Sequence, residues 1–80
     1  MVAPKIEVNA QWDPEAKVWV AESDNVPGLI TEAATLEILQ KKLSVMIPEI
    51  LEANGILDRE LTEIPFELIA HREQRISLRH

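Results

Sequence analysis

The residues that could carry acid or metal chemistry are four carboxylates near the turns in the first half of the chain: Asp13, Glu22, Asp24 and Glu32. Clustered carboxylates hold the divalent ions of many nucleases. Asp13 and Asp24, however, belong to segments that also contain Pro, and both are turn formers in their own right. No carboxylate interrupts the inward face of residues 6–12, where a ligand at the centre of a sheet would be needed. We therefore expect turn and surface roles for these carboxylates and no metal site.

Nucleophilic chemistry has even fewer candidates. The histidines are His71 and His80, both in the last ten residues, and no serine stands in a nucleophile-elbow motif. The two glycines, Gly28 and Gly55, read as a turn residue and a helix stop, so no glycine-rich phosphate loop exists. Without cysteine there is neither a thiolate zinc site nor a disulfide. We expect no enzyme activity and no cofactor.

The spacing of apolar residues predicts four strands and one helix. Residues 6–12 (IEVNAQW) alternate strictly between apolar and polar, and residues 17–23, 29–32 and 64–71 read as three more strands. Between the last two, residues 35–55 place leucine, isoleucine and methionine at intervals of three or four. Thr35 can cap this helix, and Asn54-Gly55 can end it.

The element order β-β-β-α-β predicts an α+β fold in which residues 1–80 form a single domain. The first three strands are close enough in sequence to form an antiparallel meander. A right-handed crossover through the helix most simply lays the last strand parallel to the first. The expected sheet order is 3-2-1-4, with one long helix on one face of the sheet.

The alternation within the strands also predicts which residues the helix covers. We expect the apolar stripe of the helix to pack on Ile6, Val8, Val18, Val20, Ile64, Phe66 and Leu68. By the same parity, the opposite face of the sheet should carry four apolar residues that form an interface: Trp19, Ala21, Ile30 and Ile69. An apolar outer face usually has a partner, although the C-terminal tail or the connection at residues 56–63 could instead fold over it.

Charge is unevenly distributed along the chain. The formal net charge is −6, made up of −8 over residues 1–70 and +2 over residues 71–80. An acidic body disfavours nonspecific nucleic-acid binding and suits a basic protein partner, although solubility alone explains the same charge.

No apolar run approaches the roughly 20 residues of a membrane span, and no signal-peptide core is present, so we expect a cytoplasmic protein. A chain this short gains stability by oligomerising, and we expect a homodimer or a higher oligomer.

One stretch of sequence resembles a known family. Residues 18–31 (VWVAESDNVPGLIT) and 32–37 (EAATLE) are similar to the N-terminal domain of HicB-type antitoxins and to an allied family of small proteins of unknown function. The resemblance rests on three groups of residues: Trp19-Val20-Ala21, Asp24 with Pro27-Gly28, and Thr35-Leu36-Glu37. It covers about residues 5–55.

The resemblance implies a degraded ribonuclease-H-like fold that lacks the catalytic carboxylates. It also implies oligomers and, for the antitoxins, occlusion of a small basic RNA-cleaving toxin called HicA. Many full-length antitoxins add a C-terminal DNA-binding segment, whereas only nine residues follow His71 here, so we do not expect DNA binding. We expect a non-enzymatic interaction protein of HicB type, with Glu22, Asp24 and Glu32 as acidic contacts to its partner. The alternative is an oligomeric scaffold, or a domain that binds a small ligand, with no toxin.

Overall fold

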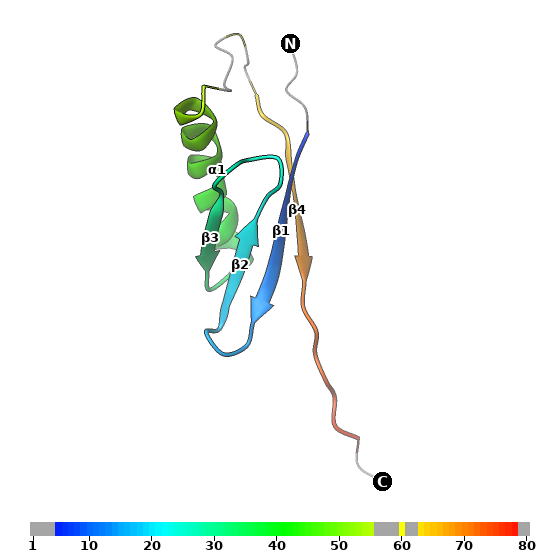
Figure 1. Ribbon diagram of the computed structural model, residues 1–80. Coiled ribbons are helices and arrows are strands. Elements are labelled where there is room, and N and C mark those ends of the chain that lie inside the picture. The colour runs from blue at the N-terminus through cyan, green and yellow to red at the C-terminus, as the bar shows by residue number, and fades with distance from the viewer. Residues whose placement is uncertain (1–4, 56–59, 61–62, 79–80) are drawn as a thin grey trace.

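The chain forms a four-stranded sheet with one helix packed on one face. A computed structural model describes residues 5–55, 60 and 63–78. The elements follow in the order β1 (Ile6–Asp13), β2 (Val18–Glu22), β3 (Ile30–Ala33), α1 (Leu36–Ala53) and β4 (Phe66–His71), as Figure 1 shows. Among the described residues, no helix has both the length and the apolar character that a membrane crossing requires.

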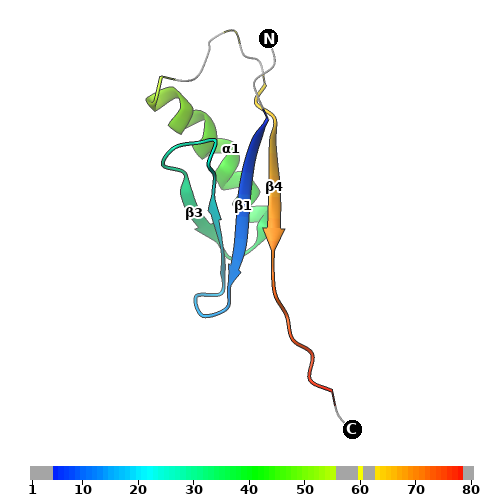
Figure 2. The ribbon, with the colours of Figure 1, turned by 45° about the vertical axis from the view of Figure 1, so that its right-hand side comes forward.

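The sheet has the order β3-β2-β1-β4. β1 pairs antiparallel with β2 and parallel with β4, and β2 pairs antiparallel with β3. Figure 2 shows the helix crossing one face of this sheet diagonally, while the opposite face carries no helix. The predicted α+β fold, sheet order and parallel final strand are therefore confirmed.

The hairpin between β1 and β2 closes through a loop of four residues, Pro14 to Lys17. Asp13 Oδ1 accepts hydrogen bonds from the backbone N–H groups of Glu15 and Ala16, at 3.0 and 3.2 Å. Lys17 has the left-handed φ of 58°, and its N–H donates to the Asp13 carbonyl at 2.8 Å. Because the loop has an even number of residues, even-numbered positions of β1 lie opposite odd-numbered positions of β2, as in the pair Trp12 and Trp19.

This register corrects the predicted faces of β2. Residues directly opposite in an antiparallel pair point to the same side of the sheet, so Trp19 and Ala21 face the helix together with Trp12 and Ala10. Trp19 is 8% exposed and Ala21 is fully buried. The prediction that these two residues lie on the uncovered face is wrong, as is the prediction that Val18 and Val20 face the helix. The placement of Ile30 and Ile69 on the uncovered face is confirmed by their pairing with Glu22 and Asn9.

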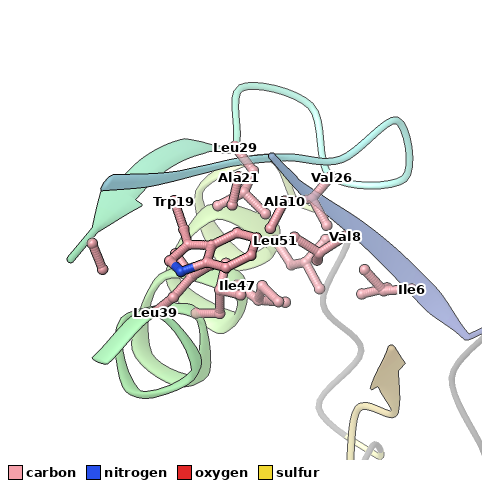
Figure 3. Close-up of a cluster of buried hydrophobic side chains, with 12 residues drawn as sticks. Ile6, Val8, Ala10, Trp19, Ala21, Val26, Leu29, Leu39, Ile47 and Leu51 are labelled. Atoms are coloured by element: carbon pink, nitrogen blue, oxygen red, sulfur yellow. The ribbon is translucent and has the colours of Figure 1, made fainter. Parts of the chain in front are cut away.

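The core lies between the sheet and the buried stripe of α1, which consists of Leu39, Leu43, Ile47 and Leu51. Figure 3 shows the Trp19 ring lying over this stripe. The remaining buried residues come from the strands and from the loop after β2: Ile6, Val8, Ala10, Ala21, Val26, Leu29 and Ala33. Ile64, Phe66 and Leu68 pack at the margin of the core and stay partly buried, as the sequence predicted for their face.

The ends of β3 and α1 are set by local turn and cap chemistry. Leu29 N–H donates to the Val26 carbonyl at 3.1 Å, which closes a turn with Pro27 second and Gly28 third. Gly28 has φ of 87°, the left-handed value that this turn type requires at its third position. Thr35 caps α1 as predicted, because its Oγ1 accepts from the Ile38 N–H at 3.1 Å.

Beyond β4 the chain leaves the body of the molecule. Residues 72–78, called the arm below, continue past the end of β4 without joining the sheet, as Figure 1 shows in orange and red. All seven are exposed, and Ile76 and Leu78 are 86% and 75% exposed. The arm does not fold back over the sheet.

Candidate interaction surface

The face of the sheet opposite α1, called the open face below, is the candidate site. No other described element covers it, so its side chains meet solvent. Strand register assigns its residues, which are Glu7, Asn9, Gln11, Asp13, Val18, Val20, Glu22, Ile30, Glu32, Glu67, Ile69 and His71. A surface of this composition can bind another molecule, but it lacks the apolar continuity of a core.

Of the four apolar residues predicted on this face, Ile30 and Ile69 lie there, at its opposite edges. One row across the sheet reads Ile30, Glu22, Asn9 and Ile69, from β3 to β4. Three strand spacings of about 4.8 Å separate the first residue from the last. Ile30 and Ile69 therefore do not form one patch, and the two residues between them in this row, Glu22 and Asn9, are polar.

The next row reads Glu32, Val20, Gln11 and His71. Together with Asn9 and Glu22, the last three of these residues line a shallow hollow of about 340 Å³. Its lining offers amide, carboxylate and imidazole groups around a single valine. Hydrogen bonding and charge, rather than apolar burial, would dominate any contact made there.

A third row brings two carboxylates together. Glu7 on β1 lies beside Glu67 on β4 in the parallel register. Lys5 forms an ion pair with Glu67, and the hydrogen bond and charge of that carboxylate raise the pKa of Lys5, with a smaller contribution from Glu7. Both partners of the pair remain largely exposed, so it relieves the repulsion without neutralising the row.

The predicted acidic contacts are partly brought together. Glu22 and Glu32 share the open face in neighbouring rows, whereas Asp24 lies in the loop that follows β2. Glu7 and Glu67 extend the acidic surface to the β1–β4 side. Neither was among the predicted contacts, although strand alternation already placed both on this face. Trp19 and Ala21 contribute nothing to the open face, because they are in the core.

The carboxylates do not converge into a metal site. Within residues 5–55, 60 and 63–78, no group of three or more His, Cys, Asp or Glu side chains could hold a metal ion. Asp13 instead accepts backbone hydrogen bonds in the first hairpin. In the described structure, the residues considered for acid and metal chemistry occupy turns and open strand positions.

Most residues in the stretch that resembles HicB-type antitoxins, residues 18–37, have an identifiable structural role. Pro27-Gly28 forms the turn before β3, Thr35 caps α1, and Trp19 and Ala21 pack in the core. Ser23 and Asn25 hold the loop on β1: Ser23 Oγ donates to the Glu7 carbonyl at 2.6 Å, and Asn25 Oδ1 accepts from the Glu7 N–H at 2.8 Å. These residues therefore hold the turns, the helix cap and the core of the fold.

Comparison with known proteins finds one family and one related crystal structure, and neither is described by an activity. Residues 5–79 match the family described as a domain of unknown function, DUF1902. The chain is also similar to a hypothetical protein, TTHA1013, from the extremely thermophilic bacterium Thermus thermophilus, whose crystal structure is known. The two are 52% identical, the match covers 94% of this chain and 100% of the other, and the TM-score is 0.69. No curated protein matches this chain significantly.

Proposed function

The chain belongs to the DUF1902 family of domains of unknown function, and from this premise we propose that it is a non-enzymatic interaction protein of the HicB-antitoxin type. It binds a small basic protein on its open face and masks that protein's RNA-cleaving surface. The observation that carries the proposal is the uncovered face with Glu7, Glu22, Glu32 and Glu67 on four adjacent strands.

Charge and geometry both support a basic partner. A flat polar face with distributed carboxylates complements a lysine- or arginine-rich surface, which speeds encounter and selects the partner. Ile30 and Ile69 at the two margins add apolar contact beside the charged centre. A partner held mainly by charge should bind less tightly as salt is raised, because exposed charges are screened.

Co-expression with the small basic protein encoded beside this one provides the test. We expect the two to co-purify, and we expect Glu22→Lys with Glu32→Lys to weaken binding at least tenfold, or about 1.4 kcal/mol. Affinity is measured by calorimetry on purified proteins, and masking is measured as the loss of RNA cleavage by the partner.

The matched control is Glu49→Lys with Glu52→Lys. These two exposed residues lie on α1, and their replacement changes the net charge by the same amount. Affinity should then fall by less than about threefold, because only long-range charge is altered. Equal losses in the two double variants would contradict binding on the open face. The absence of any small basic partner would contradict the antitoxin assignment.

A second candidate is an oligomeric scaffold without a toxin. It is supported by the exposed Ile76 and Leu78 of the arm, which a monomer leaves in water. A stable oligomer that binds no basic protein would favour this function. The hollow around Asn9 and His71 could admit a small polar ligand in such a scaffold.

A further inference from the structure

The arm and the outer edge of β4 are complementary to each other, but they cannot meet within one chain. We propose that two copies of this protein pair their β4 edges antiparallel about a two-fold axis, so that the arm of each copy extends along β4 of the other. The contact gives a structural basis for the self-association named in the second candidate function, and it does not depend on a basic partner.

β4 presents an unpaired edge. It is the last strand in the order β3-β2-β1-β4, so only its β1 side is hydrogen-bonded. Ile6 N–H donates to the Pro65 carbonyl at 3.1 Å, and alternate residues of a strand direct their backbone groups to the same side. The backbone groups of Phe66, Leu68 and Ala70 therefore point to the open edge. An uncovered edge of this kind is a template for another strand.

The helix leaves space beside this edge. α1 packs over β2 and β3, so the helix-side surface of β4 is only partly covered. Phe66 and Leu68 point to that surface and remain half-buried. Apolar side chains from a second molecule could complete their burial.

The arm carries the residues that fit this space. The first residue of the arm is already aligned with β4, because the Arg72 guanidinium lies over the Trp12 ring. The distance between Arg72 Cζ and the ring centroid is 4.3 Å. Trp12 in turn makes an edge-on contact with Trp19, so Arg72 lies on the helix side of the sheet. Continuing the same alternation places Ile76 and Leu78 on that side and Arg75 on the open face.

Symmetry then selects the register. A two-fold axis perpendicular to the sheet keeps each face on its own side, so even-numbered residues pair with even-numbered ones. An axis at Arg72 pairs Leu68 with Ile76 of the second copy and Phe66 with its Leu78. This register uses the whole of β4, from Phe66 onward, and the arm as far as Leu78.

Charges on the open face agree with this register. Ile69 lies opposite Arg75 of the second copy, which brings that arginine diagonally beside Glu67, within reach of long side chains. His71 lies opposite Glu73 of the second copy. The arm carries Arg72 and Arg75 against one acid, Glu73, and exchange between copies brings Arg75 of each copy near Glu67 of the other.

The first test is the solution mass of the full chain. We expect twice the chain mass of 9.1 kDa by sedimentation equilibrium at micromolar concentration. Ile76→Lys with Leu78→Lys should raise the dissociation constant at least tenfold, while the domain still unfolds cooperatively on heating because the arm lies outside the core. The matched control, Ile38→Lys with Val45→Lys, adds the same charge at exposed positions on α1 and should remain dimeric.

The second test locates the axis by disulfide formation in a chain that has no native cysteine. Arg72→Cys should cross-link two copies on mild oxidation, because residues paired at the axis lie about 5.5 Å apart, within disulfide range. Gln74→Cys should not, since four residues of strand separate the two Gln74 positions by about 14 Å.

Several results would overturn the arm contact. They are a wild-type mass of one chain, a dimer unaffected by lysine at positions 76 and 78, and cross-linking at position 74 as fast as at 72. A monomer that still binds a basic protein would overturn the arm contact alone. A dimer that binds no basic protein would overturn only the antitoxin assignment.

Discussion

At the residue scale, side chains replace backbone pairing where β1 and β2 separate. The last cross-strand pair at this end joins Asn9 and Glu22, and Glu7 has no strand partner on that side. Ser23 and Asn25 satisfy the Glu7 carbonyl and N–H instead, and Asn25 N–H donates back to Ser23 Oγ at 3.2 Å. The loop that carries Val26 and Leu29 into the core is thereby attached to β1.

We predict that Asn25→Ala lowers the free energy of unfolding by about 1 kcal/mol, because the Glu7 N–H loses its acceptor. The measurement is urea denaturation followed by circular dichroism. Asn25→Asp keeps an oxygen at this position and should cost less. If the two variants are equally destabilised, the hydrogen bond to Glu7 is not the source of the effect.

At the element scale, the length of one loop decides which side of β2 is buried. Alternation alone allows either face of VWVAE to point inward, since Val18 and Val20 are as apolar as Ala21. The four-residue hairpin loop couples β2 to β1 so that Trp19 faces the core and Val20 faces solvent. The large ring of Trp19 then fills space under α1 that two valines would leave empty.

We predict that Trp19→Ala lowers the free energy of unfolding by about 3–5 kcal/mol, as expected for a large core aromatic. Val20→Ala should cost less than about 1.5 kcal/mol, since this half-buried valine points away from the helix. Thermal and urea denaturation of the two variants measure the difference. A larger loss for Val20 than for Trp19 would reverse the assignment of faces.

At the scale of the whole molecule, we propose two separate places for other chains. The open face is proposed for a basic protein, and the β4 edge with the arm is proposed for a second copy. The two are compatible, because pairing at the edge extends the sheet and leaves the rows around Glu22 and Glu32 uncovered.

We predict that the melting temperature depends on protein concentration, because unfolding of a dimer is coupled to its dissociation. For two chains of this size, a tenfold increase in concentration should raise the melting temperature by about 4 °C. For the variant with lysine at positions 76 and 78, the melting temperature should depend less on concentration, because less of it is dimeric. Differential scanning calorimetry distinguishes the two, and a wild-type protein without this dependence would contradict the coupling.

The order of the elements and of the strands could be read from the sequence, because both follow from local rules. Periods of two and of three to four residues identify strands and helix, Pro27-Gly28 and Thr35 mark their limits, and the handedness of the crossover places β4 beside β1. The acidity of the body and the basicity of the tail are also properties of the sequence alone.

Only the tertiary structure decided which residues share a surface. Shifting the pairing register of β2 against β1 by one residue exchanges the two faces of β2. No local signal within β2 distinguishes the two registers. For the same reason the expected patch of Trp19, Ala21, Ile30 and Ile69 does not exist: two of its members are buried, and the other two lie at opposite edges of the sheet. The row that joins Glu7 to Glu67, and the half-buried surface of β4 beside the arm, arise from pairing between segments sixty residues apart.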